Sequence, residues 1–166
     1  FMDTVTGMMP AGTAAYEKRG VAADLPHWDV KNCMQCNWCA SVCPHAVVRP
    51  FVMTAEEAEG VADAVPMKGA KDKKFTLGWS LMDCTGCGSC AEVCPARNKA
   101  ITMAPAEEHF MHEAQAKFDK LYQEVDEKET PFKESTVKGA QLKTPLMEFS
   151  GACPGCGETP YAKLVT

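Results

Sequence analysis

The stretch Cys33-Met-Gln-Cys36-Asn-Trp-Cys39-Ala-Ser-Val-Cys43-Pro44 decides the fold of this chain. It recurs as Cys84-Thr-Gly-Cys87-Gly-Ser-Cys90-Ala-Glu-Val-Cys94-Pro95, with every cysteine at the same spacing as in the first run. The alanine and the valine before the last cysteine also recur. Self-similarity of this kind indicates two copies of one structural unit.

Three thiolates at steps of three residues can wrap a short loop around one inorganic cube, and a fourth ligand must come from elsewhere. In the two-cluster arrangement, the cysteine before the proline binds the cluster of the other run. The spacing therefore predicts two complete [4Fe-4S] clusters, the first on Cys33, Cys36, Cys39 and Cys94, the second on Cys84, Cys87, Cys90 and Cys43. Because cysteines fill every ligand position, we expect one-electron transfer rather than substrate chemistry.

Two other uses of eight cysteines fit less well. Four-cysteine zinc sites use separated CxxC pairs rather than four cysteines within eleven positions. Disulfides are typical of exported proteins, whereas Phe1-Met2-Asp3-Thr4 lacks the basic and apolar character of an export signal. We therefore expect a cytoplasmic protein with metal-bound thiolates.

The composition supports a metal-organised core. The 166 residues include ten cysteines, whereas Leu, Ile, Val and Phe are too scarce for an ordinary hydrophobic core. Metal sites replace core in chains that bury little apolar surface. The net charge of −5 argues against a nucleic-acid partner, and no apolar run approaches the roughly 18 residues of a membrane span.

The flanking sequence predicts an α+β fold of two pseudo-equivalent strand–helix–strand halves, with an insertion, a helical arm and a connector. Residues 1–30 form a lead-in, and residues 31–105 the two-cluster domain, with an exposed insertion at 52–74 and a strand at 75–81. Residues 106–148 hold an amphipathic helix at 110–125, ended by Thr130-Pro131, and then an extended connector. A new compact motif begins at residue 149.

Several smaller features leave alternatives open. The pair Cys153 and Cys156 fits a redox dithiol, half of a zinc site or half of a third iron–sulfur site. Trp38 is either ordinary packing or a shield that separates the potential of its cluster from that of the glycine-rich second run. His109 and His112 are expected on a solvated helix surface. Both ends of the chain suggest a piece of something longer.

The chain resembles pyruvate:ferredoxin (flavodoxin) oxidoreductases over nearly its whole length. Besides the two cysteine runs, the resemblance rests on Pro10-Ala-Gly-Thr-Ala-Ala-Tyr-Glu-Lys-Arg-Gly20, on Thr136-Val-Lys-Gly139 and on residues 145–163. The last stretch contains Cys153-Pro-Gly-Cys156-Gly-Glu-Thr-Pro-Tyr161. The lead-in and this ending are much narrower signals than the cysteine runs, which many ferredoxin-like proteins share.

The resemblance implies a homodimeric anaerobic enzyme that decarboxylates pyruvate on thiamine diphosphate and passes single electrons through three [4Fe-4S] clusters to ferredoxin or flavodoxin. Cys153 and Cys156 would be two ligands of the third cluster, and Glu158 would lie where the thiamine diphosphate-binding domain begins, within residues 149–166. This segment alone would not decarboxylate pyruvate. A free-standing electron carrier, or the same segment of an oxidoreductase for another 2-oxoacid, are the alternatives.

Overall fold

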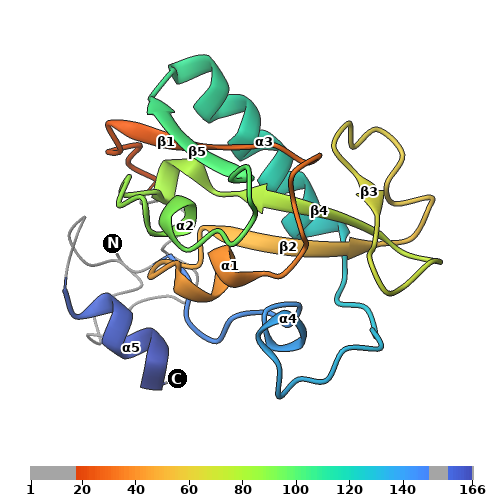
Figure 1. Ribbon diagram of the computed structural model, residues 1–166. Helices are drawn as coiled ribbons and strands as arrows, with labels where there is room; N and C mark the ends of the chain where they lie inside the picture. Colours follow the sequence, from red (N-terminus) through yellow and green to blue (C-terminus); the bar gives the residue numbers. More distant parts are fainter. Residues whose placement is uncertain (1–17, 150–156, 166) are drawn as a thin grey trace, which may run out of the picture.

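The computed structural model describes residues 18–149 and 157–165 (Figure 1). Two small antiparallel sheets and short helices form an α+β fold. In chain order the elements are β1 (Asp24–Trp28), α1 (Trp38–Val42), β2 (Val48–Met53), β3 (Val65–Pro66), β4 (Lys74–Trp79), the 3-10 helix η3 (Leu81–Asp83), α2 (Ser89–Glu92), β5 (Ile101–Pro105), α3 (Glu108–Glu124), α4 (Val137–Ala140) and α5 (Thr159–Val165).

The two halves of the repeat exchange strands. The first half runs β1–α1–β2 and the second β4–α2–β5, yet β1 pairs with β5 and β2 with β4, while the short β3 extends the second sheet. Trp28 stands opposite Ile101 in one sheet, and Trp79 opposite Val48 in the other. Each sheet therefore contains one strand from each half, so neither half is complete without the other.

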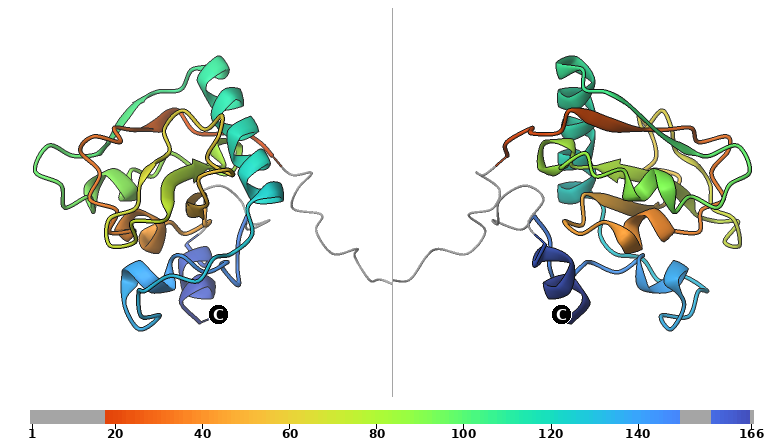
Figure 2. Two further views of the ribbon diagram at one scale, coloured as in Figure 1. Left: turned by 90° about the vertical axis from the view of Figure 1, so that its right-hand side faces the viewer. Right: turned by 60° about the vertical axis from the view of Figure 1, so that its left-hand side comes forward.

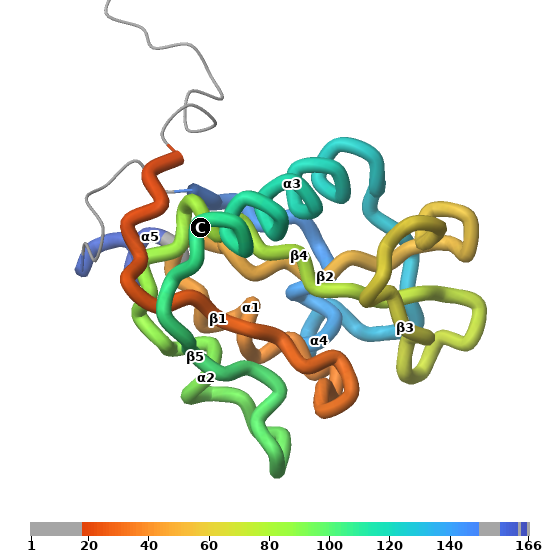
Figure 3. Tube along the Cα trace, turned by 90° about the horizontal axis from the view of Figure 1, so that it is seen from above, coloured from red at the N-terminus to blue at the C-terminus, as the bar shows by residue number. Residues whose placement is uncertain are grey.

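The strands lie between two groups of helices. Helices α1 and α2 contact each other on one side of the strands, and the long helix α3 packs against β4 from the other side. Figure 2 and the view from above in Figure 3 show this arrangement. The main core runs from Leu25 and Phe75 to Leu77 and Leu81, all almost fully buried.

Helix α3 packs against β4 at Gly78, a glycine within the strand. A Cβ atom at Gly78 would lie 2.5 Å from the Phe51 ring and 3.1 Å from that of Phe118, so only glycine permits this close approach. The sequence predicts an apolar face on this helix, and two residues of that face, Phe118 and Leu121, are buried. The helix ends at Glu124, before the predicted stop at Thr130-Pro131, because the backbone turns extended at Val125.

The insertion is less exposed than the sequence predicts, because Met67 and Ala70 belong to the main core. Its base is part of the sheet: β2 continues to Met53 and β4 begins at Lys74. Thr54 and Glu57 form reciprocal hydrogen bonds of 2.8 and 3.2 Å that fix its first turn, as in a capping box. The insertion therefore forms one wall of the domain.

The connector after α3 contains one short helix. In α4 the hydroxyl of Thr136 accepts the Gly139 N–H at 3.2 Å, and a Cβ atom at Gly139 would lie 2.1 Å from the Lys133 carbonyl oxygen. This tight turn brings α4 against α1. No helix of the described residues is long and apolar enough to cross a membrane.

Candidate iron–sulfur centres

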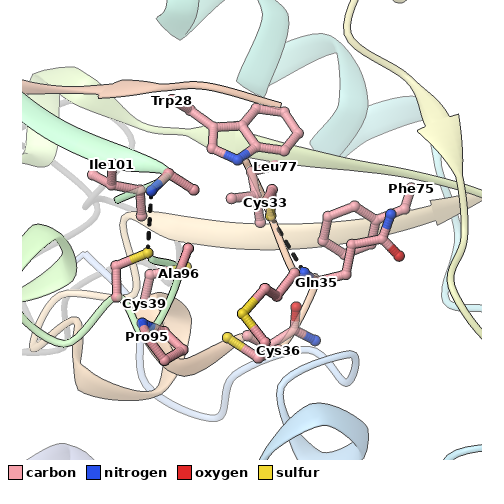
Figure 4. A pocket seen from close by; sticks show the side chains of 14 residues that line it. Trp28, Cys33, Gln35, Cys36, Cys39, Phe75, Leu77, Pro95, Ala96 and Ile101 are labelled. Atoms are coloured by element: carbon pink, nitrogen blue, oxygen red, sulfur yellow. Dashed lines mark hydrogen bonds between the residues drawn. The ribbon is translucent and has the colours of Figure 1, made fainter. Parts of the chain in front are cut away.

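The eight cysteines of the two runs gather around two cavities of similar size. The first cavity (Figure 4) is lined by Cys33, Cys36, Cys39 and Cys94. The second is lined by Cys84, Cys87, Cys90 and Cys43. Each cavity thus contains three thiols from one run and the proline-preceding thiol from the other.

Both cysteine loops follow the same backbone path. Gln35 and Asn37 have φ angles of 58° and 63°, and the equivalent Gly86 and Gly88 have φ angles of 70° and 75°. These left-handed residues turn the chain around each cavity, and each pair precedes a short helix that carries the third cysteine. Glycine adopts this conformation freely, whereas a residue with a Cβ atom pays a steric cost.

Side-chain hydrogen bonds hold the first loop in its unfavourable conformation. The Gln35 amide donates to the Pro66 carbonyl at 3.0 Å and accepts the Lys68 N–H at 2.7 Å. The Asn37 amide donates to the Lys138 carbonyl at 3.0 Å. Both side chains are almost fully buried. The insertion and α4 therefore fix the first loop, while the second loop uses glycines instead.

Backbone N–H groups point at sulfur in both loops. The Gln35 N–H donates to Cys33 Sγ and the Gly86 N–H to Cys84 Sγ, each at 3.4 Å. The proline-preceding cysteines accept at 3.3 Å as well, Cys43 from the Val47 N–H and Cys94 from that of Ala100. Such donors stabilise negative charge on sulfur, as cluster thiolates require. This pattern is symmetric although the loop sequences differ.

The cavity walls are largely apolar, and burial between them raises the pKa of several thiols. Burial is the largest cause that raises the pKa of Cys84 to about 11 and that of Cys90 to about 12, with the neighbouring thiolates adding to it. Burial likewise raises the pKa of Cys39, and the thiolates of Cys33, Cys36 and Cys90 reinforce the effect. Thiolates crowded in such walls require a cationic centre between them.

One buried donor on the first cavity has no partner. The indole Nε1 of Trp28 is buried and makes no hydrogen bond among the described residues. Leaving such a group unsatisfied costs about 1–3 kcal/mol. Trp28 lines the first cavity, and in Figure 4 its nitrogen faces the cysteine sulfurs. An unpartnered buried donor, four thiols and N–H groups directed at sulfur are chemically suited to an iron–sulfur cluster.

Lysines add positive charge around the loops. Lys68 Nζ donates to the Cys33 carbonyl at 2.9 Å, and Lys138 Nζ to the Lys68 carbonyl at 2.9 Å. Lys99 Nζ donates to three carbonyls, including that of Cys94 at 3.0 Å. Burial lowers the pKa of Lys138, and the nearby Cys36 opposes that shift. These cations offset part of the negative charge that eight thiolates bring.

No two thiols of the described residues are joined in a disulfide. Nor does any group of three or more His, Cys, Asp or Glu side chains in residues 18–149 and 157–165 converge to hold a single ion. The thiols instead stand around cavities, which is the arrangement that a polynuclear cluster needs.

The remaining candidate residues lie apart from the cavities. Trp38 is half exposed, and the lining of neither cavity in the described structure includes it. His109 and His112 lie exposed on α3, and Glu158 is exposed just before α5. Cys153 and Cys156 lie outside the described residues.

Sequence reasoning missed Trp28, although a signal was present. Trp28 and Trp79 occupy equivalent positions, each at the end of a strand that leads into a cysteine loop. A search for repeats that included the strands would have paired them.

Two exchanged halves, paired four-thiol cavities and N–H donors at sulfur define the chain as a ferredoxin-like dicluster iron–sulfur protein. The 4Fe-4S dicluster domain family matches residues 29–98. Over nearly its whole length the chain is similar to a segment of pyruvate:ferredoxin and pyruvate-flavodoxin oxidoreductases.

Three relatives illustrate the match. The chain is 48% identical to pyruvate:ferredoxin oxidoreductase of Moorella thermoacetica, over 98% of the chain and 14% of the relative. It is 44% identical to pyruvate-flavodoxin oxidoreductase of Klebsiella pneumoniae, over 100% of the chain and 14% of the relative. It is 40% identical to the mitochondrial NADP⁺-dependent pyruvate dehydrogenase of Euglena gracilis, over 98% of the chain and 9% of the relative. The chain therefore spans a small part of these oxidoreductases.

Proposed function

We propose that this chain is the electron-transfer segment of an oxidoreductase that oxidises pyruvate, and that it passes single electrons between two [4Fe-4S] clusters. The first cluster is held by Cys33, Cys36, Cys39 and Cys94, and the second by Cys84, Cys87, Cys90 and Cys43. The observation that carries the proposal is the crossed lining of the two cavities, each with three thiols of one run and one of the other.

A bound cluster supplies one-electron redox chemistry. The protein's part is to hold four thiolates in place, keep water away and stabilise the added negative charge. The buried strand residues Leu77 and Ile101 help to form the wall of the first cavity. The buried Val48 and the partly buried Met103 help to form that of the second. Because the loops are fixed by packing and hydrogen bonds, little rearrangement accompanies the arrival of an electron.

The two sites lie close enough to exchange an electron within the domain. Helices α1 and α2 contact each other, and the charge of Cys90 contributes to the raised pKa of Cys39. These two thiols come from different sites. In this proposal an electron passes from one cluster to the other across the α1–α2 contact.

We also propose that Cys153 and Cys156 are two ligands of a third [4Fe-4S] cluster, and that Glu158 lies beside a thiamine diphosphate site completed by residues outside this sequence. The support is the likeness to pyruvate oxidoreductases over nearly the entire chain. In this arrangement Cys153 and Cys156 would hold a cluster able to relay single electrons between the thiamine site and the two outer sites.

The external acceptor is ferredoxin or flavodoxin in this proposal, and the complete enzyme is a homodimer. Relatives are named for ferredoxin, flavodoxin or NADP⁺ as acceptor. Because the same segment accompanies all three names, its own task is the internal transfer that precedes the acceptor.

The test uses the full-length parent polypeptide, purified without oxygen. We expect pyruvate and coenzyme A to support ferredoxin reduction, and the variants Cys43→Ala and Cys94→Ala to lose it at least 100-fold. A single turnover should still release carbon dioxide from pyruvate in both variants, because the thiamine site is elsewhere. Ferredoxin reduction without pyruvate dependence would instead indicate a free-standing carrier. Zinc in place of iron would refute the proposal.

A further inference from the structure

The two cavities differ in one buried donor. Trp28 ends β1 and Trp79 ends β4, so the repeat places an indole at the same point in each half. Trp28 lines the first cavity, whereas the lining of the second, within the described residues, contains no tryptophan. The repeat is therefore broken at this position.

The surroundings fix the Trp28 ring. Phe75 packs edge-on against it, with 6.5 Å between ring centroids and 70° between ring planes. Lys117 Nζ lies 5.8 Å from the ring centroid, held there by Asp63, Thr76 and the Leu77 carbonyl. A cation over an aromatic face withdraws electron density from the ring, which strengthens the indole N–H as a donor.

The Trp28 Nε1–H is buried without a partner and faces the sulfur side of the cavity (Figure 4). The lining of this cavity contains the sulfurs of Cys33, Cys36, Cys39 and Cys94, and also Asn37, whose Oδ1 is buried without a partner in the described structure. Buried donors are almost always paired in native proteins. An iron–sulfur cluster offers sulfur acceptors whose negative charge grows on reduction, and a donor to them raises the reduction potential.

We propose that the Trp28 indole N–H donates a hydrogen bond to a sulfur of the first cluster and raises its reduction potential above the value that the same cavity would give without this donor. The inference rests on the proposed function, because it needs a cluster in the first cavity. In this inference Trp28, rather than Trp38, sets the difference in reduction potential between the two clusters.

The test compares Trp28→Phe with Trp79→Phe in the iron-loaded protein, by redox titration followed with electron paramagnetic resonance. Phenylalanine keeps the aromatic packing and removes the donor. We expect Trp28→Phe to shift one cluster couple to a more negative potential and to leave the others in place. Trp79→Phe, the matched control, should move none of them. An unmoved couple in Trp28→Phe with full iron content would overturn the inference while leaving the proposed function intact.

A second measurement needs no change at residue 28. The protein is labelled with ¹⁵N in the indole ring, carries Trp38→Phe and Trp79→Phe, and is reduced for electron–nuclear double resonance. We expect a ¹⁵N coupling and an exchangeable proton coupling on one cluster signal. A protein with both clusters and neither coupling would also overturn the inference. Absence of any cluster signal would contradict the proposed function first.

Discussion

The first and second cysteine loops reach one backbone geometry by different means. The second loop places glycines at its two left-handed positions, Gly86 and Gly88. The first places Gln35 and Asn37 there and holds them with buried hydrogen bonds to the insertion and to α4. The second loop is thus specified locally, whereas the first depends on segments far away in the sequence.

This difference has a consequence for the two clusters. The insertion and α4 exist on one side of the repeat only, so they restrain the first site while the second lacks a counterpart in the described residues. Tertiary contacts can therefore change one site without the other. The tests below change one half at a time, beginning with the largest expected effect.

The crossed ligands give the sharpest comparison. Cys94 lies in the second run, yet we expect Cys94→Ala to remove the first cluster. Cys43 lies in the first run, and Cys43→Ala should remove the second cluster. Each variant should retain about four irons fewer than the parent protein. Iron and sulfide analysis, with electron paramagnetic resonance to identify the remaining cluster, measures the result. Loss of the cluster of the variant's own run would contradict the crossed assignment.

In the second loop, we expect an added methyl group to destabilise the fold more at Gly86 than at Gly88. Gly86→Ala places a Cβ atom 3.0 Å from the Asp24 carbonyl oxygen at a φ of +70°, whereas a Cβ at Gly88 meets nothing within 4 Å. We expect destabilisation of about 2–3 kcal/mol for Gly86→Ala and about 1 kcal/mol for Gly88→Ala.

Anaerobic thermal unfolding measures this difference. For a chain of this size the midpoint should fall by about 4–10 °C in Gly86→Ala and by about 2–4 °C in Gly88→Ala. Equal midpoints in the two variants would show that the Asp24 contact contributes nothing.

The first loop should respond to loss of its side-chain bonds. Gln35→Ala removes two buried hydrogen bonds and leaves the Pro66 carbonyl and the Lys68 N–H unsatisfied. We expect a loss of about 1–2 kcal/mol. Gln35→Gly, which copies the second loop, should lose less because glycine adopts a φ of 58° without strain.

Thermal unfolding and the rate of cluster release in the presence of a chelator would measure both variants. Gln123→Ala, on the exposed face of α3, is the control and should leave the midpoint unchanged. A Gln35→Gly variant less stable than Gln35→Ala would refute the strain argument.

The smallest effect concerns the insertion and its dependence on pH. Glu57 accepts from Lys128 at 2.8 Å, and its pKa lies below the ordinary value of 4.5: burial opposes this shift, and hydrogen bonds from Lys128 and Thr54 outweigh it. A carboxyl with a lowered folded pKa stabilises the fold above its unfolded pKa and loses that contribution as pH falls below 4.5. The pair is only partly buried and solvent screens it, so we expect about 0.2–1 kcal/mol.

Glu57→Gln keeps the bond to the Thr54 N–H and removes the charge. It should lower stability in urea unfolding at pH 7 and have less effect at pH 3.5, because protonation of the unfolded chain below pH 4.5 removes part of the contribution of the charge. The measurement uses cluster-depleted protein at both values, since acid itself attacks iron–sulfur clusters. An equal effect at both values would assign the loss to packing rather than to charge.

The sequence alone predicted the repeat, the α+β class and the helix before the connector, because these follow from local spacing and periodicity. Cysteine steps of three and the proline after each fourth cysteine are local features, and they also predicted the crossed ligand sets that we propose. The sequence reading went astray where the outcome depends on distant contacts. The insertion at 52–74 was predicted to be exposed, yet Met67 and Ala70 belong to the main core.

Only the tertiary structure decided that Trp28 lines the first cavity, that Gln35 and Asn37 adopt left-handed backbone angles, and that Met67 of the insertion joins the core. The physical reason is the same in each case. Strand exchange and the packing of the insertion bring together groups far apart in the chain, and burial then fixes which donor faces the sulfurs. Local spacing therefore determined where the thiols are, while long-range packing determined what surrounds them.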